Sequence, residues 1–495
     1  MTSKIRTVIT TDMECDDMNS LIHLCLYLND IDLVGIIYTA SQYHFNGDGI
    51  HTLGEITKHY RCQGKAAIEE NIGYPKADIN ASNLKAYRPF EEGWIEKLWQ
   101  NEYASIYPQL LKHDSNYPSP EYLLSITKVG NIAFEGDVTK ETEGSNYLKD
   151  LILDEDPRKL YIQSWGGANT IARSLLSIYE EYHDTKLWQE VYQKVTDKIV
   201  IFGIQNGIGQ DNTYQDYIVP IFPNLKVLCS THIYGTFFAA KESPLDCIEM
   251  FQGEWLKENI KEGKGQLLAK YGLWNDGQTY QGEPERFQYG HHHHLNWGFD
   301  MIDNIAFDDY DFLGEGDSNT YLPLLPVGLK GLENNTYGTL LGTLYQDGTT
   351  PKDPIYDPLS GEKKYYQRFI KAYQEEFATR ALWCIKEPNE VAHPPHITIK
   401  QDTFFAQPGE TIPLQAILSD DNNYPLIYGW DLYEEGSTFD SKIGHPAVFD
   451  ALSLNTSFTV PKNAQQNDIF NFILTVRQNC EHSITRYGQV IIHVK

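Results

Sequence analysis

Four carboxylates crowd into one short turn near the start of the chain. Residues 7–10 form a short apolar run typical of a strand, and residues 18–28 carry apolar side chains at helical spacing. Between them lie Asp12, Glu14, Asp16 and Asp17. In an α/β sheet, a turn from strand to helix lies at the carboxyl end of the strand, where such folds build their sites. The sequence therefore predicts an α/β sheet with an acidic site at this edge.

Like charges this close repel one another, so either some of the acids stay protonated or a cation neutralises them. Clustered carboxylate oxygens suit a hard cation, Ca²⁺ or Mg²⁺. Asp16 and Asp17 alone would be explained by the dipole at the helix N-terminus. Asp12 and Glu14 precede the helix, and this favours a metal site over a purely structural role.

Three later runs, 33–38, 160–164 and 198–203, are expected to be strands. The first is continuously apolar and reads as buried on both faces, as in a parallel sheet, and the third also reads as buried. His44 follows the first run and could be an acid at the site or a surface residue. The turn 165–170 follows the second run, and its two glycines allow close backbone approach. Asn169 lies there as a helix N-cap or a structural contact. The polar segment 210–217 follows the third run, and it could be either a loop that binds substrate or a solvent-exposed polar loop.

The acidic turn resembles the opening motif of the nucleoside hydrolases, an Asp-rich turn that finishes in Asp-Asp. The match is closer to the nucleoside hydrolase-like, cellulose-binding proteins with a C-terminal immunoglobulin-like domain. This resemblance implies a mostly parallel sheet flanked by helices, and Ca²⁺ ahead of Mg²⁺ as the cofactor. It implies that Asp12 is a metal ligand and the general base. Asp17, Asp317 and the Trp165 carbonyl would complete the set of ligands.

The resemblance also implies a substrate site around the ion. Its candidates are Glu14, Asp16, His44, Asn169, Asp211, Asn212, Asp216 and Glu315. The usual Pro-Gly of the family is Met13-Glu14 here, and Gly316 stands where the family has a histidine that helps to protonate the leaving base. Glu315 could substitute for it. The four histidines at 291–294 read as a flexible polar loop rather than as the leaving-group acid.

A change of pattern near residue 390 predicts two domains. Residues 365–383 read as an amphipathic helix, and 386–395 as a proline-containing linker. From 396, apolar residues alternate in short runs at the spacing of a β-sandwich. The predicted domains are 1–390, the nucleoside hydrolase-like catalytic domain, and 396–495, the immunoglobulin-like sandwich. A chain that ends near Ala392 is expected to stay soluble unless the interface is large and apolar.

The rest of the chain gives coarser expectations. Residues 50–59 and 255–263 read as helices, and 225–228 as a strand. Residues 122–132 read as helix or mixed structure. Residues 71–119 are rich in Tyr, Trp, Asn and Pro with little periodicity, which predicts an irregular insertion with short helices that could form part of a lid.

Charge and composition limit the partners. The net charge of −28 argues against nucleic acid and anionic membranes. No run of 18 apolar residues predicts a membrane span. Seven scattered cysteines without CxxC spacing suit reduced thiols, and no signal peptide is visible at the start. A cytoplasmic location is therefore expected, unless an exported protein has been trimmed, and a homo-oligomer is left open.

Two functions remain open. The first is a metal-dependent hydrolase of N-glycosidic or related glycosyl bonds, acting on a small nucleoside or carbohydrate. The second is a non-catalytic carbohydrate-binding (cellulose-binding) protein, for which an aromatic content of 13% could supply stacking platforms. A bound ion with an open coordination position facing a cleft would favour the hydrolase.

Overall fold

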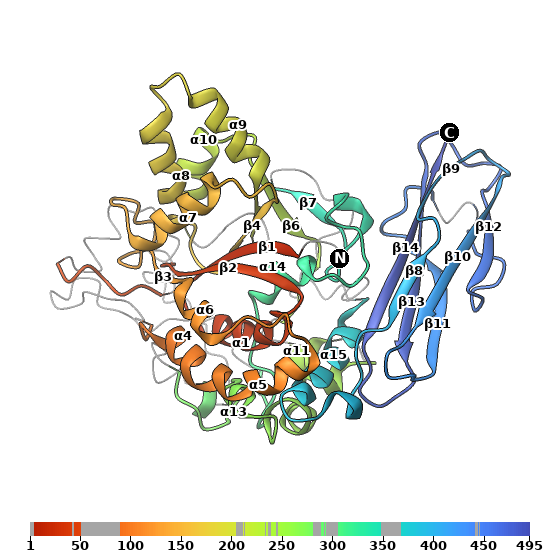
Figure 1. Cartoon of the computed structure of the whole chain (residues 1–495), viewed down its shortest axis with the longest axis horizontal. Coiled ribbons are helices and arrows are strands. Elements are labelled where there is room, and N and C mark those ends of the chain that lie inside the picture. The colour runs from red at the N-terminus through yellow and green to blue at the C-terminus, as the bar shows by residue number, and fades with distance from the viewer. Residues whose placement is uncertain are drawn as a thin grey trace. The chain divides into compact units, whose positions relative to one another are not determined.

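The structure is a computed structural model that describes residues 4–41, 44–50, 90–203, 211, 213–232, 234–235, 239–243, 246–280, 289–291, 293, 305–347, 368–440, 444 and 446–495. The chain divides into two compact units (Figure 1). The first comprises Met1–Cys229, Tyr234–Tyr321 and Gln346–Gly348, and the second Ser230–Ile233, Leu322–Tyr345 and Thr349–Lys495.

A seven-stranded sheet organises the N-terminal part of the chain, in the order β3-β2-β1-β4-β5-β6-β7. Its strands are β1 (Ile5–Thr11), β2 (Ile31–Tyr38), β3 (Thr127–Val129), β4 (Leu160–Ser164), β5 (Ile199–Phe202), β6 (Lys226–Ser230) and β7 (Leu344–Gln346). All pairs from β3 to β6 are parallel. β1, β4 and β5 are buried almost throughout, because helices cover both faces of the sheet. The predicted fold class is confirmed.

The helices of the first unit lie in two layers (Figure 1). They are α1 (Cys15–Leu24), α4 (Trp94–Lys97), α5 (Ala104–His113), α6 (Pro120–Ser125), α7 (Glu143–Leu153), α8 (Asn169–Tyr182), α9 (Trp188–Lys198), α10 (Val219–Ile221), α11 (Ala239–Glu242), α12 (Gly253–Leu256), α13 (Gln266–Ala269) and α14 (Ser318–Tyr321). In Figure 1, α7 to α10 lie on one side of the sheet, and α1, α4, α5 and α6 on the other. Leu148 of α7 and Ile171 of α8 share a core with Val8 and Ile162 of the sheet.

The irregular insertion with short helices expected over 71–119 is helical in its described part, but more regular than predicted. Residues 94–113 form one continuous helical stretch, in which a π-helical segment (Leu98–Tyr103) joins α4 to α5. The side chains of Ile95, Trp99, Ile106 and Leu110 on this stretch are buried. Their spacing is helical, but they stand among many polar and aromatic neighbours that obscure the period. Residues 71–89, and the helix expected over 50–59 except its first residue, lie outside the described residues.

The second unit contains the predicted β-sandwich. Its strands are β8 (His396–Ile399), β9 (Thr403–Ala406), β10 (Thr411–Ser419), β11 (Leu426–Leu432), β12 (Asn455–Thr459), β13 (Ile469–Gln478) and β14 (Thr485–Val494). They form a three-stranded sheet, β12-β10-β8, and a four-stranded sheet, β11-β13-β14-β9. Alternating side chains such as Leu414, Trp430, Phe458 and Phe472 fill the core between them.

Helix α15 (Ile370–Trp383) belongs to this second unit and contacts β14. Glu376 of α15 is buried between two arginines, Arg380 Nε at 2.8 Å and Arg486 Nη1 at 2.8 Å. Burial raises the pKa of Glu376, but the two arginines outweigh it and leave the pKa lowered. The sequence placed this helix before the boundary at 390. That boundary stays a prediction about which segment folds alone.

Within the described residues, no helix combines the length and apolar content needed to cross a bilayer. Six of the seven cysteines are described, and all six are free thiols.

Candidate active site

Three carboxylates converge at the N-terminus of α1. Asp16 and Asp17 belong to its first turn, and Asp317 directly precedes α14. One oxygen of each lies within 4.8 Å of the others. The chain turns sharply between β1 and α1, because Met13 adopts a left-handed conformation with φ 60°. The acidic site expected from the first turn is thus built from two segments that lie far apart in the sequence.

Burial and mutual repulsion raise the pKa values of these acids. Burial is the largest cause for Asp17, followed by the charges of Asp317, Asp12 and Asp16, and its pKa stands well above the usual value. The pKa of Asp317 is also raised well above its usual value, by burial and then by Asp16 and Asp12. A divalent cation would relieve this repulsion and keep the acids ionised.

Asp12 lies beside the three converging acids, fully buried directly after β1. Its Oδ1 accepts a hydrogen bond from the N–H of Glu14 at 3.4 Å. Its Oδ2, like Oδ1 of Asp317, has no hydrogen-bond partner within the described part of the chain. A buried carboxylate oxygen without a partner is costly, so these two atoms fit a donor set for a hard cation. The acids that are present therefore suit a hard divalent cation such as Ca²⁺ or Mg²⁺.

His44 is buried against this site. Burial raises the pKa of Asp12, while the charge of His44 and the hydroxyl of Ser41 lower it, and the pKa remains raised overall. The loop closes on itself, since the Ser41 N–H donates to the His44 carbonyl at 2.9 Å and the His44 N–H to the Ser41 hydroxyl at 3.2 Å. Of the two readings left open for His44, the surface residue is wrong, because this closed loop places it inside.

The glycine turn after β4 packs directly on Asp12. A Cβ added to Gly166 would lie 2.9 Å from Cβ of Asp12, so only glycine permits this approach. Trp165 is buried, its backbone N–H donates to the Thr10 carbonyl at 2.8 Å, and its indole N–H donates to the Thr320 hydroxyl at 2.6 Å. The turn is therefore fixed against the site. The role of the Trp165 carbonyl as a ligand stays a prediction.

Asp211 holds the N-terminus of α8, which follows this turn. Its Oδ2 accepts from the Asn169 N–H at 3.1 Å, and its Oδ1 from the Thr213 N–H at 2.9 Å. Ala168 occupies the N-cap position and has no side chain for capping, so Asp211 supplies the carboxylate from another loop. Burial outweighs these bonds and raises the pKa of Asp211 to about 6.

Asn169 makes structural contacts and is not the N-cap of α8. Its Oδ1 accepts from the Thr39 hydroxyl at 2.7 Å, and its Nδ2 donates to the Asn131 carbonyl at 2.8 Å. The side chain thus ties the start of α8 to the end of β2. Of the two roles weighed from the sequence, the structural contact is the one present.

Glu315 lies in a buried network between α1 and the loop that carries Asp317. Its carboxylate accepts from the hydroxyls of Tyr271 and, at 2.6 Å, of Ser318, and it pairs with His23 Nδ1 at 2.9 Å. Both oxygens are therefore engaged inside the protein. Sequence reasoning missed His23 and Tyr271, because each is a single residue whose partner lies far away in the chain.

Gly316 has a spatial reason to be glycine. A Cβ there would clash with Oδ2 of Asp16. The carboxylate of Asp16 thus occupies the space beside the position where the resemblance drawn from the sequence expects a histidine.

The remaining candidates are exposed, half-buried or outside the described residues. Asp216 is exposed on the π-helical turn η3 (Tyr214–Ile218). Glu14 is half-buried at the N-cap position of α1, and its charge contributes to the raised pKa of Asp317. Asn212 lies outside the described residues, as do the second and fourth residues of the histidine run 291–294. His291 and His293 are exposed, in keeping with a polar loop.

A mostly parallel sheet, with acids gathered at the carboxyl end of its first strand, defines a nucleoside hydrolase-like α/β protein. The chain belongs to the family described as cellulose-binding Sde182, nucleoside hydrolase-like domain, which matches residues 6–343. Residues 411–494 match the C-terminal domain of cellulose-binding protein Sde0182. The resemblance drawn from the sequence is confirmed.

Among solved structures, the chain is similar to a nucleoside hydrolase-related hypothetical protein from Saccharophagus degradans, described as associated with carbohydrate metabolism. The identity is 21%, all of both chains is covered, and the TM-score is 0.66, which supports the fold alone. Murine CRIg matches 20% of this chain and 98% of its own, at 14% identity and a TM-score of 0.15. No curated protein matches the chain.

Proposed function

We propose that this protein is a Ca²⁺-dependent hydrolase of N-glycosidic or related glycosyl bonds. The observation that carries the proposal is the buried meeting of Asp12, Asp17 and Asp317, with two carboxylate oxygens that lack hydrogen-bond partners within the described residues. Its location at the carboxyl end of a parallel strand is where α/β folds place their ligands. The family's nucleoside hydrolase-like description supports the same reaction class.

Each residue has a distinct task in this proposal. Asp12, Asp17 and Asp317, with Asp16 or the Trp165 carbonyl, would hold the ion, which would supply acidity to a water molecule and fix its direction. Asp12 would serve as the general base that takes a proton from the attacking water. The surrounding carboxylates stabilise the positive charge that develops on the sugar in an oxocarbenium-like transition state.

The departing group also needs a proton. Glu315 is engaged by His23, Tyr271 and Ser318, so it is a poor source. His44 is buried beside Asp12, close enough for its charge to lower the pKa of that carboxyl, and this position makes it the better candidate.

The test is a screen of nucleosides and aryl glycosides with and without a chelator. On any substrate that is cleaved, Asp12→Asn should lower the rate by about 100-fold or more, because it removes the base. Asp184→Asn, at an almost fully exposed acid, is the matched control and should keep the wild-type rate. Unchanged turnover in Asp12→Asn, or full activity in chelator, would refute the proposal.

A second candidate is a non-catalytic carbohydrate-binding protein. Two observations favour it: both matching families are described as cellulose-binding, and Gly316 replaces the histidine of the hydrolases. This reading predicts retention on cellulose in the presence of chelator and no cleavage of any glycoside in the screen. Metal-dependent cleavage would rule it out.

A further inference from the structure

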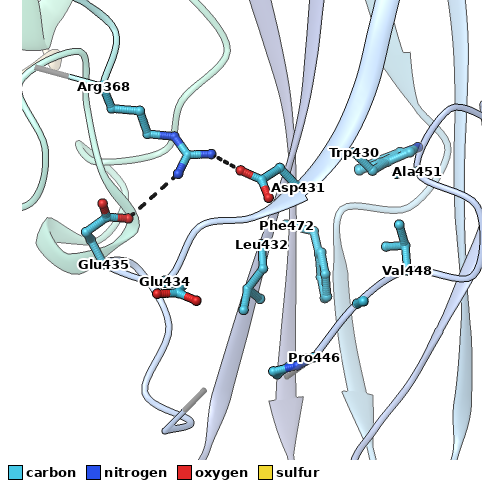
Figure 2. Close-up of a pocket in the computed structure, with 11 residues that line it drawn as sticks. Arg368, Trp430, Asp431, Leu432, Glu434, Glu435, Pro446, Val448, Ala451 and Phe472 are labelled. Carbon is cyan, nitrogen blue, oxygen red and sulfur yellow. Dashed lines mark hydrogen bonds and ion pairs between the residues drawn. The ribbon is translucent and has the colours of Figure 1, made fainter. Parts of the chain in front are cut away.

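A pocket of about 460 Å³ opens beside β11 in the second unit (Figure 2). Trp430, Asp431 and Leu432 contribute from β11, Phe472 from β13, and a nearby segment contributes Ala447 and Val448. Its volume lies within the range of roughly 300–1,000 Å³ that small-molecule sites occupy. The pocket is concave, so a short flexible ligand fits it better than the flat surface of a partner protein would.

One side of the pocket is polar and fixed in place. The Arg368 guanidinium forms ion pairs with Asp431 and, at 3.9 Å, with Glu435 (Figure 2). It also lies over the ring of Tyr433, 5.4 Å from the centroid. These contacts hold a planar donor group that is still 31% exposed to solvent. A ligand oxygen can therefore bind an arginine that needs no reorganisation.

The other side of the pocket is apolar and rigid. Trp430 and Phe472 belong to the sandwich core, and Val448 packs against that core from the facing segment. In Figure 2, Val448 and Pro446 lie across from the Arg368–Asp431 pair. A pocket with carboxylates and a guanidinium on one wall and apolar carbons on the other matches a sugar ring. Such a ring presents hydroxyls at its edge and C–H groups on its faces.

The charges of the residues that line the pocket further restrict the class of ligand that it can bind. Asp431, Glu434 and Glu435 bring three carboxylates against the single guanidinium of Arg368. Acidic sugars and phosphates are therefore repelled, whereas neutral hydroxyls can donate to the carboxylates and accept from the arginine. We infer that this pocket is a second site, which binds a neutral saccharide. The inference rests on the carbohydrate ligand proposed above, but at a different site from the acids around Asp12.

The test is calorimetric titration of the full chain with cellohexaose, in chelator so that the acidic site holds no ion. Ala447→Trp fills the pocket and should weaken binding about tenfold or more. Phe449→Ala is the matched control, since Phe449 is 90% exposed on the same segment and does not line the pocket. Asp317→Ala should also bind normally, so a failure of the hydrolase proposal would leave this result unchanged.

A second variant keeps the test decisive if Ala447→Trp fails to fold. Arg368→Gln keeps a polar side chain but shortens it and removes the charge-assisted bonds, and it should weaken binding by about tenfold. Loss of binding in Phe449→Ala with none in Ala447→Trp would overturn the inference in favour of the exposed ring. Loss in Asp317→Ala would overturn it in favour of the acidic site. Binding of an oligolysine peptide in place of cellohexaose, blocked by Ala447→Trp, would also overturn it.

Discussion

Asp211 makes the stability of this fold depend on pH in a direction that can be derived. Burial raises its pKa from 3.8 to about 6. A carboxyl group whose pKa is raised by folding binds more protons in the native state than in the unfolded state. The stability that it contributes is therefore present at low pH, and it is lost as the pH rises from about 4 through 6.

The size of this effect follows from the same values. One pKa unit corresponds to about 1.4 kcal/mol, and most of the change from 3.8 to about 6 falls between pH 4 and pH 7. Asp211→Asn cannot titrate. Between these pH values, the free energy of unfolding of the wild type should therefore fall by about 2–3 kcal/mol relative to that of the variant.

Urea denaturation of both proteins at half-unit steps of pH measures this difference. The Asn variant keeps only one acceptor oxygen for the Asn169 and Thr213 N–H groups, so its absolute stability will also change, but that offset does not depend on pH. Asp216→Asn, at an exposed acid, is the control and should follow the wild type. Parallel profiles for wild type and Asp211→Asn would refute the reasoning. If the profiles were parallel and Asp211→Asn also lost activity, the result would favour the substrate contact that the sequence predicted for Asp211.

Three further predictions concern the ion and the second unit. Calcium at a hundredfold excess over its Kd should stabilise the wild type by about 2.7 kcal/mol in thermal unfolding, and Asp317→Ala should remove this gain. Glu376→Gln should lower the free energy of unfolding by about 3 kcal/mol or more, measured in urea, because it leaves Arg380 and Arg486 buried without their counter-ion. A chain that ends at Ala392 separates α15 from β14, so, contrary to the solubility expected from the sequence, it should aggregate on size-exclusion chromatography; a monomeric peak would contradict this.

Local pattern was enough to predict most of the fold. The apolar runs of β1, β2, β4 and β5 gave a buried parallel sheet, because strands covered on both faces have no polar side. The sandwich was predictable because each of its strands has one face in the core and one in solvent, so apolar and polar residues alternate along it. Helix α15 was assigned to the first domain, since nothing in its own sequence reveals that Glu376 meets Arg486 of β14.

The candidate site was predictable only where its parts are close in the sequence. Asp16 and Asp17 were found from spacing, but Asp317 needed the family resemblance, because 300 residues separate it from Asp17. The burial of His44 and the engagement of Glu315 by His23 depend on contacts between distant segments. A single histidine or glutamate carries no periodic signal that would reveal its surroundings.

The distance between Asp17 and Asp317 also sets an order of events during synthesis. At about 5–20 residues per second, a ribosome needs about 15–60 s to make the intervening chain. Throughout that time the nascent first turn holds its acids without the segment that closes the cluster. Capture of an ion by the complete set must wait until Asp317 has left the exit tunnel. An ion would then bind late, and it would link the end of the first unit to its beginning.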